Sequence, residues 1–309
     1  MKPGPVRWIV FAALLLMLVL TTTSAYIRLA QAGLGCADWP ACYGRAVRLP
    51  EAGQLFPGQT PLFWAHALHR LTASAVGVLL ILIVFLGREE MRGAGARLAA
   101  WMVLVLAVLL AALGTVTPSN LPAVTLGNLL GGMSMIALLW GLLQRGRGES
   151  AGRWLLGLAF AALTLQIALG GMIGARYAAL SCVSLPACGA GWWPESTDWR
   201  LVTPFFASSA SDKVSAALVP LVMAHRYGAL LVAAILCALG VGAVRRGARA
   251  ATLGWVLLGM LGLQLLLGAT MVLANFRLPL ALMHNLGAAL LLGTSISLLW
   301  PHAATAEQA

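Results

Sequence analysis

Histidines inside apolar stretches are the side chains of this chain best suited to chemistry. His66 and His69 lie three residues apart in FWAHALHRL, and His225 and His284 lie in two later apolar runs. Neutral imidazole binds metal ions and moves protons near neutral pH, whereas a buried polar ring without a partner is costly. A hydrogen-bonded core histidine is the simplest explanation for any one of these residues. Several histidines at one depth favour a shared ligand instead.

The composition shows which elements must position these histidines. Of the 309 residues, 61% are hydrophobic and 9% are charged, whereas about 25% of the residues in a soluble domain are charged. Apolar runs of about 20 residues recur, which is long enough to cross a bilayer core of about 30 Å. We therefore predict an all-α membrane protein with eight transmembrane helices, over residues 8–27, 63–87, 98–117, 121–144, 154–175, 216–243, 252–274 and 279–300.

The net charge of +11 indicates orientation in the membrane rather than binding of nucleic acid. The short segments on the side of the N-terminus are basic, as the positive-inside rule requires of cytoplasmic segments. They hold Lys2, Arg7, Arg88, Arg92, Arg97, Arg145, Arg147, Arg153, Arg245, Arg246 and Arg249. We therefore expect the N- and C-termini to be cytoplasmic and expect no nucleic-acid partner.

Two halves of the chain, residues 1–149 and 150–309, carry the same features in the same order. Each half has a long outer loop with a cysteine pair, CADWPAC or CVSLPAC, followed by a His-Arg dipeptide and later by a span that begins with Leu-Pro. An even number of spans in each unit gives both copies the same orientation. The order predicts two duplicated four-helix bundles.

The cysteine pairs Cys36/Cys42 and Cys182/Cys188 lie in loops on the outer side of the membrane, which in a bacterium faces the oxidising periplasm. We expect a disulfide bond within each pair. Free thiols and a redox exchange with another protein are the alternatives that the sequence leaves open. A metal site is disfavoured because neither loop contains a histidine.

Three of the histidines share a depth. Counted from the outer ends of their spans at 1.5 Å per residue, His69, His225 and His284 lie about 9–13 Å into the membrane. Zinc would need further ligands, but all nine acidic residues fall outside the spans. Haem iron takes one or two axial histidines from facing helices, so the pattern favours haem. The guanidinium groups of Arg70 and Arg226 could bind haem propionates or reach the outer headgroups.

Several features together resemble the haem A synthases. They are eight spans in two halves, a cysteine pair in the outer loop of each half, His-Arg in spans two and six, and HNLGAALLLG in span eight. The resemblance covers essentially the whole chain and implies an enzyme that oxidises the C8 methyl group of haem O to a formyl group, making haem A for terminal oxidases. It also implies one haem pocket per half. His225 and His284 would hold a cofactor haem b in the C-terminal half, and His69 would belong to the substrate pocket in the N-terminal half.

Two positions depart from the pattern of that family. Its second span has Glu-x-x-His-Arg, with the glutamate implicated in catalysis, whereas this chain has His66 at that place. Its fourth span has a histidine where this chain has Asn128, or Gly127 in a second alignment. His66 would then handle protons or face a propionate, or be a replacement that lowers activity. His69 would bind haem alone or with a second ligand that the sequence does not reveal.

The leading hypothesis is therefore oxidation of haem O in the bacterial inner membrane by a multi-pass protein with periplasmic cysteine loops. The alternative is a non-catalytic bis-histidine b-type cytochrome or haem-handling assembly factor. A transporter is disfavoured because the spans lack acidic residues for ion coupling. Expected partners are membrane lipid, a haem O synthase and an electron donor, since no flavin or nicotinamide motif is present. The sequence leaves open whether the chain forms a homo-oligomer.

Overall fold

The structure is a computed structural model that describes residues 4–34, 39–41, 43, 61–88, 90–91, 94–117, 121–144, 153–188, 198–207 and 216–298. Within these ranges eight helices are long and apolar enough to cross a membrane. They are α1 (Pro5–Gln31), α2 (Pro61–Leu86), α3 (Ala94–Gly114), α4 (Pro122–Leu143), α5 (Arg153–Ala175), α7 (Val219–Val244), α8 (Ala248–Leu273) and α9 (Leu278–Ser297). The predicted all-α class and the eight spans are confirmed, with ends that differ by a few residues.

Local sequence sets where several of these helices begin and end. Proline occupies the first or second position of α1, α4, α7 and α9, where its missing N–H is not needed and its fixed φ favours a helix. After α8 ends, Asn275 and Phe276 adopt positive φ angles of 52° and 55°. This tight reversal leads directly into α9 and so sets how far His284 lies from the first residue of its helix, Leu278. The sequence did not predict the short helix α6 (Trp199–Val202).

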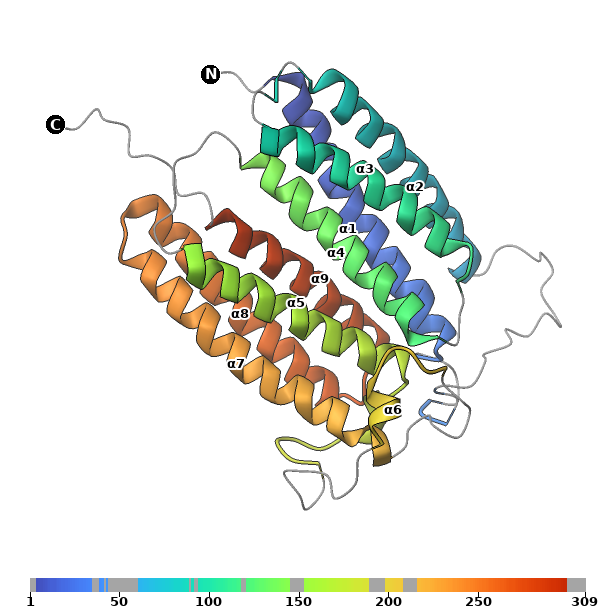
Figure 1. The fold of residues 1–309 in the computed structure, drawn as a ribbon. Coiled ribbons are helices and arrows are strands. Elements are labelled where there is room, and N and C mark those ends of the chain that lie inside the picture. The colour runs from blue at the N-terminus through green and yellow to red at the C-terminus, as the bar shows by residue number, and fades with distance from the viewer. Residues whose placement is uncertain are drawn as a thin grey trace.

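The long helices pack as two groups that lie side by side (Figure 1). In the first group α1 contacts α2 and α4, and α3 contacts α2 and α4. In the second group α7 contacts α5 and α8, and α9 contacts α8 and α5. The groups meet where α9 packs against α1 and α4, and where α4 packs against α5. One buried apolar cluster spans both groups and includes Met17, Leu80, Ile136, Leu236 and Leu291.

A polar contact joins the two groups at the end of α9 that is far from the cysteine loops. Ser297 of α9 accepts hydrogen bonds at its Oγ from Trp140 Nε1 at 2.8 Å and from Gln144 Nε2 at 3.0 Å. Many large apolar side chains on the other faces of the helices are exposed, among them Leu71 and Leu273. In a bilayer such side chains face lipid, so the polar groups of the spans are directed towards neighbouring helices.

Candidate functional site

His225 projects from α7 towards α5, where it meets Gln166. The Nε2 amide of Gln166 lies 3.0 Å from His225 Nδ1 and donates to the backbone oxygen of His225 at 2.8 Å. One carboxamide therefore contacts both the ring and the main chain of the same residue. Such a two-point contact fixes the position of the imidazole more firmly than one hydrogen bond does.

His284 on α9 is held in the same way by α8. The Nε2 amide of Gln264 lies 3.3 Å from His284 Nε2 and donates to the backbone oxygen of His284 at 2.9 Å. Helices α7 and α9, which lie diagonally across the second group, thus each present one glutamine-bound histidine.

Glycines make room for both rings. A Cβ atom at Gly170 would lie 3.1 Å from Cε1 of His225, and one at Gly268 would lie 3.2 Å from Cε1 of His284. Each glycine follows the glutamine on its own helix by four residues, which places it one turn further along the same face. The imidazole therefore packs directly on the backbone of the neighbouring helix.

A second pair of glycines makes room for the glutamines. A Cβ atom at Gly228 would overlap Oε1 of Gln166, and one at Gly287 would overlap Oε1 of Gln264. Each of these glycines follows its histidine by three residues. The second group of helices therefore contains one arrangement twice, built from the sequence patterns Gln-x-x-x-Gly and His-x-x-Gly.

Three polar atoms in this region are buried and have no hydrogen-bond partner among the residues that the structure describes: Oε1 of Gln166, Oε1 of Gln264 and Nδ1 of His284. An unsatisfied buried polar atom costs free energy and requires an explanation. Here the atoms belong to two glutamine–histidine pairs that were recognised on other grounds. Such a set of atoms is expected where a ligand supplies the missing partners.

The histidines of the first group are held differently. Nδ1 of His66 donates to the backbone oxygen of Leu62 at 2.8 Å, one turn earlier in the same helix. The ring of His69 is partly buried and makes no hydrogen bond to any residue that the structure describes. On α4, Nδ2 of Asn128 donates to Oγ1 of Thr117 at 3.1 Å. The predicted residues His66, His69 and Asn128 are therefore not joined by hydrogen bonds to one another.

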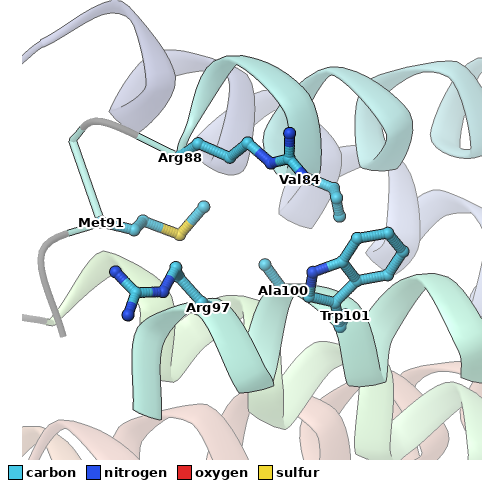
Figure 2. A pocket seen from close by; sticks show the side chains of 6 residues that line it. All are labelled: Val84, Arg88, Met91, Arg97, Ala100 and Trp101. Carbon is cyan, nitrogen blue, oxygen red and sulfur yellow. The ribbon is translucent and has the colours of Figure 1, made fainter. Parts of the chain in front are cut away.

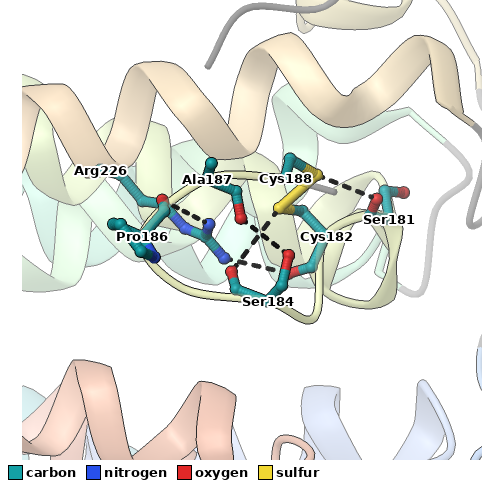
Figure 3. Close-up of a disulfide and its surroundings, with 7 residues drawn as sticks. All are labelled: Ser181, Cys182, Ser184, Pro186, Ala187, Cys188 and Arg226. Atoms are coloured by element: carbon teal, nitrogen blue, oxygen red, sulfur yellow. Dashed lines mark hydrogen bonds between the residues drawn. A yellow bond between two sulfur atoms is a disulfide. The ribbon is translucent and has the colours of Figure 1, made fainter. Parts of the chain in front are cut away.

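The two arginines that follow His69 and His225 also differ. The side chain of Arg70 is exposed. Arg226 is half-buried and donates from Nη2 to the backbone oxygen of Cys182 at 3.0 Å and from Nη1 to that of Pro186 at 3.2 Å. Figure 3 shows this guanidinium lying against the loop after α5. The pairing of Arg226 with a haem propionate stays a prediction.

The loop held by Arg226 contains a disulfide bond between Cys182 and Cys188, as the sequence predicts (Figure 3). Their Cα atoms lie 5.3 Å apart, a normal separation for a disulfide. Ser184 Oγ donates to the backbone oxygen of Ala187 at 2.7 Å and tightens the loop further. The predicted partner bridge, Cys36–Cys42, lies outside the described residues.

Within the described residues, neither a metal cluster nor the cavity between α2 and α3 coincides with the predicted site. No group of three His, Cys, Asp or Glu residues gathers within the described ranges, so a zinc-like site is not formed there. A cavity of about 290 Å³ lies between the ends of α2 and α3 that are remote from the histidines (Figure 2). Its lining, which includes Arg88, Arg97 and Trp101, contains none of the predicted site residues.

Sequence reasoning missed Gln166 and Gln264, which the structure places against the histidines. A signal for them existed. Spans five and seven each contain Gln-x-x-x-Gly, and spans six and eight each contain His-x-x-Gly. Matching polar residues on adjacent apolar spans indicate a contact, because a lone amide in a span needs a partner.

The fold and the site define a multi-pass helical membrane protein with two glutamine-bound histidines in one four-helix group. A family model described as cytochrome oxidase assembly protein matches residues 7–296. The chain is 33% identical over 316 residues to a protein of Shewanella oneidensis called heme A synthase, and the alignment covers 94% of each chain. The chain therefore belongs to this cytochrome oxidase assembly family, and the family resemblance inferred from the sequence is confirmed.

Proposed function

We propose that this chain is a haem A synthase: an oxidoreductase that converts the C8 methyl group of haem O into a formyl group. The observation that carries the proposal is the histidine pair of α7 and α9 in a chain that matches the relative called heme A synthase from end to end. Both histidines lie in spans that contain no acidic residue. Such an environment suits a large, mostly apolar cofactor that is bound through neutral nitrogen.

We propose haem b as the cofactor of the C-terminal half, where His225 and His284 would hold its iron. The residues fit this group. Helices α7 and α9 present one imidazole each, each ring packs on a glycine of an adjacent helix, and buried polar atoms of the glutamine–histidine pairs have no hydrogen-bond partner among the described residues. When bound, such a group supplies one-electron transfer. The chain contributes the orientation of the rings and the exclusion of water by the surrounding apolar helices.

The N-terminal half is proposed to bind the substrate haem O, with His69 as the iron ligand. His66 lies one turn nearer the outer surface on roughly the same face of α2. Its Nδ1 proton is engaged by the oxygen of Leu62, which leaves Nε2 as an acceptor. His66 is therefore suited to accept a proton or a propionate-bound water at the site. Asn128 stands where the family has a second histidine, and an amide is a poor iron ligand.

Two equivalent halves are part of the proposal, residues 1–149 for the substrate and 150–309 for the cofactor. The helix contacts support a duplication. If α1 corresponds to α5, α2 to α7, α3 to α8 and α4 to α9, the contact between α1 and α9 becomes a contact between α5 and α4, which is also present. A two-fold axis that relates the halves would convert the contact between α1 and α9 into the contact between α5 and α4, so both contacts are expected together.

The membrane location is proposed from topology. Basic inner segments favour the bacterial inner membrane with both termini cytoplasmic, and the disulfide Cys182–Cys188 favours a periplasmic position for the cysteine loops. The proposed partners are lipid, a haem O synthase that supplies the substrate and a separate electron donor.

The second candidate is a non-catalytic b-type cytochrome or haem-handling factor. It is favoured by His66, which takes the place of the family glutamate and bonds to its own helix. Expression of the full chain with a source of haem O, followed by extraction of the haems, separates the two. Formyl-bearing haem A that is lost in His69→Ala supports the enzyme. Haem b with unconverted haem O, unaffected by His69→Ala, contradicts it.

A further inference from the structure

We propose that the cavity between α2 and α3 binds the headgroup of an acidic phospholipid. The cavity lies at the ends of these helices that are remote from the histidines, which in the membrane orientation proposed above is the cytoplasmic leaflet. Its lining combines two guanidinium groups, a tryptophan and three apolar side chains: Val84, Arg88, Met91, Arg97, Ala100 and Trp101. The proposal is independent of the haem chemistry.

The two arginines reach the cavity from different segments. Arg88 follows the end of α2 and Arg97 lies in the first turn of α3, with Met91 between them (Figure 2). Neither guanidinium group forms an ion pair or a hydrogen bond with a residue that the structure describes. Two cations on opposite sides of one cavity attract an anion, and guanidinium groups bind phosphate oxygens in a bidentate way.

The described carboxylate nearest to the cavity in sequence is directed elsewhere. A Cβ atom at Gly4 would lie 2.5 Å from Oε2 of Glu90, so this carboxylate lies against the residue that precedes α1. The start of a helix carries partial positive charge and stabilises an acid. Glu89 and Arg92 are outside the described residues and together add no net charge. Among the described residues, the charge that lines the cavity therefore comes from the two arginines.

The aromatic side chains match the interface between headgroups and acyl chains. Trp101 follows Arg97 by four residues in α3, which places it about 6 Å deeper along the helix. Tryptophan is typical of this interface, and its indole N–H is a hydrogen-bond donor. The rings of Phe85 and Trp101 pack edge to face with their centroids 6.4 Å apart, and Arg88 lies 5.8 Å from the centroid of Phe85. The cationic end of the cavity therefore leads into an aromatic layer.

The surrounding surface and the volume favour a lipid over a soluble anion. Deeper in the membrane the outer faces of α2 and α3 carry exposed apolar side chains, among them Ile81 and Val105. A phosphate held by the arginines would place its acyl chains along these faces. The cavity of about 290 Å³ is at the lower end of the range for small-molecule pockets, about 300–1,000 Å³. It therefore suits a phosphodiester headgroup better than a macrocycle.

The second half of the chain lacks these arginines at the corresponding place. We aligned the His-Arg dipeptides of α2 and α7 and, for α3 and α8, the segments that begin with Trp101 and Trp255. This pairs four cavity residues with residues of the second half: Val84 with Gly240, Arg88 with Val244, Arg97 with Ala251 and Ala100 with Gly254. Both arginines are thus replaced by apolar residues.

The same place in the second half is also closed by close packing. A Cβ atom at Gly254 would lie 2.6 Å from the backbone oxygen of Gly240 and 2.9 Å from Cγ2 of Val244. Helices α7 and α8 therefore meet backbone to backbone where α2 and α3 leave a cavity. The larger Val84 and Ala100 keep the first pair of helices apart. The cavity is thus a property of the N-terminal sequence and is not imposed by the fold.

The test measures lipid binding to the full chain, purified in detergent and freed of co-purified lipid. Phosphatidylglycerol is titrated and bound lipid is counted by native mass spectrometry. Arg88→Gln and Arg97→Gln should each weaken binding about 10-fold, because each removes charge-assisted hydrogen bonds to the phosphate. Arg245→Gln is the matched control, since Arg245 is an exposed arginine directly after α7, and should leave the affinity unchanged. Equal losses in all three variants would indicate general attraction between charges and contradict the site.

Two further comparisons identify the ligand and its place. Phosphatidylcholine with the same acyl chains should bind at least 10-fold more weakly, and glycerol 3-phosphate should not displace phosphatidylglycerol at equal concentration. Equal binding of the two lipids, or displacement by the soluble phosphate, contradicts an acidic lipid as the ligand. Ala100→Leu fills the cavity without a change of charge and should weaken binding as the arginine variants do. Full affinity in Ala100→Leu would show that the lipid does not enter the cavity.

The outcome is separable from the failure of the proposed function, because no step of the test uses haem. If the chain makes no haem A but binds phosphatidylglycerol through Arg88 and Arg97, the lipid site stands and the proposed function is wrong. If haem A is made but the arginine variants bind the lipid as the unmodified chain does, the lipid site is wrong.

Discussion

In the C-terminal half each histidine is bound by a glutamine and packed on a glycine of a neighbouring helix, whereas in the N-terminal half the ring of His69 makes no hydrogen bond within the described residues. The arginines that follow show the same contrast. Arg226 is tied to the disulfide loop, and Arg70 is exposed. The C-terminal half thus fixes His225, His284 and Arg226 through contacts with other segments, whereas the described residues of the N-terminal half provide no such contact for His69 and Arg70.

This difference matches two different tasks. A cofactor that remains bound gains from ligands whose rotamers are already fixed, because less conformational freedom is lost on binding. A substrate that must enter, react and leave gains from a site that holds it less tightly. We infer that the two halves have diverged in this direction, with the firm site at His225 and His284 and the exchangeable site at His69.

The largest expected effect is the loss of either firm ligand. His225→Ala or His284→Ala should remove the low-spin bis-imidazole spectrum and most of the bound haem, because the remaining imidazole leaves one axial position open. His69→Ala should leave that spectrum intact. Absorption and electron paramagnetic resonance spectra of the purified chain measure this. A low-spin spectrum that depends on His69 and survives both C-terminal changes would reverse the assignment of the halves.

The glycines offer the next largest effect. Gly170→Ala and Gly268→Ala place a methyl group 3.1–3.2 Å from an imidazole carbon, which forces the ring to shift and should lower haem affinity about 10-fold. Gly174→Ala in α5 and Gly262→Ala in α8 are matched controls, because a Cβ atom there meets nothing within 4 Å. Haem titration of the four variants measures the effect. Equal haem affinities of all four variants would show that His225 and His284 do not bind haem with their rings in the positions described.

The sequence was sufficient to predict the eight spans and to single out the histidines as candidate site residues, because both inferences depend only on local composition. Eight apolar runs dictate eight helices, and a histidine in such a run is conspicuous. The contacts of Gln166 and Gln264 depend on which spans are neighbours, and composition does not encode that. Helix α6 has four residues, too few for a periodic pattern. Asn128 was identified by its place in the family pattern, but its bond to Thr117 depends on the turn after α3.

The smallest expected effect concerns the two arginines. Arg226→Ala removes two charged hydrogen bonds to the loop that contains the Cys182–Cys188 disulfide and should destabilise that region by about 1–3 kcal/mol. The loop should then be reduced faster by a mild thiol. Arg70→Ala removes no hydrogen bond within the described residues and should change the melting temperature little. Thermal unfolding and thiol-trapping of the cysteines measure both. Equal effects of Arg226→Ala and Arg70→Ala on stability and on the rate of reduction would show that the two arginines do not differ in the way described.

The central claim is that the site at His225 and His284 keeps haem bound more tightly than the site at His69. Haem retention tests this claim most directly. The purified full chain, loaded with haem, is incubated with an excess of a haem-scavenging apoprotein, and the haem that remains is quantified by its spectrum. We expect a low-spin bis-imidazole haem to remain and to be lost in His225→Ala but not in His69→Ala. Retention that depends on His69 and is indifferent to His225 and His284 would contradict the account.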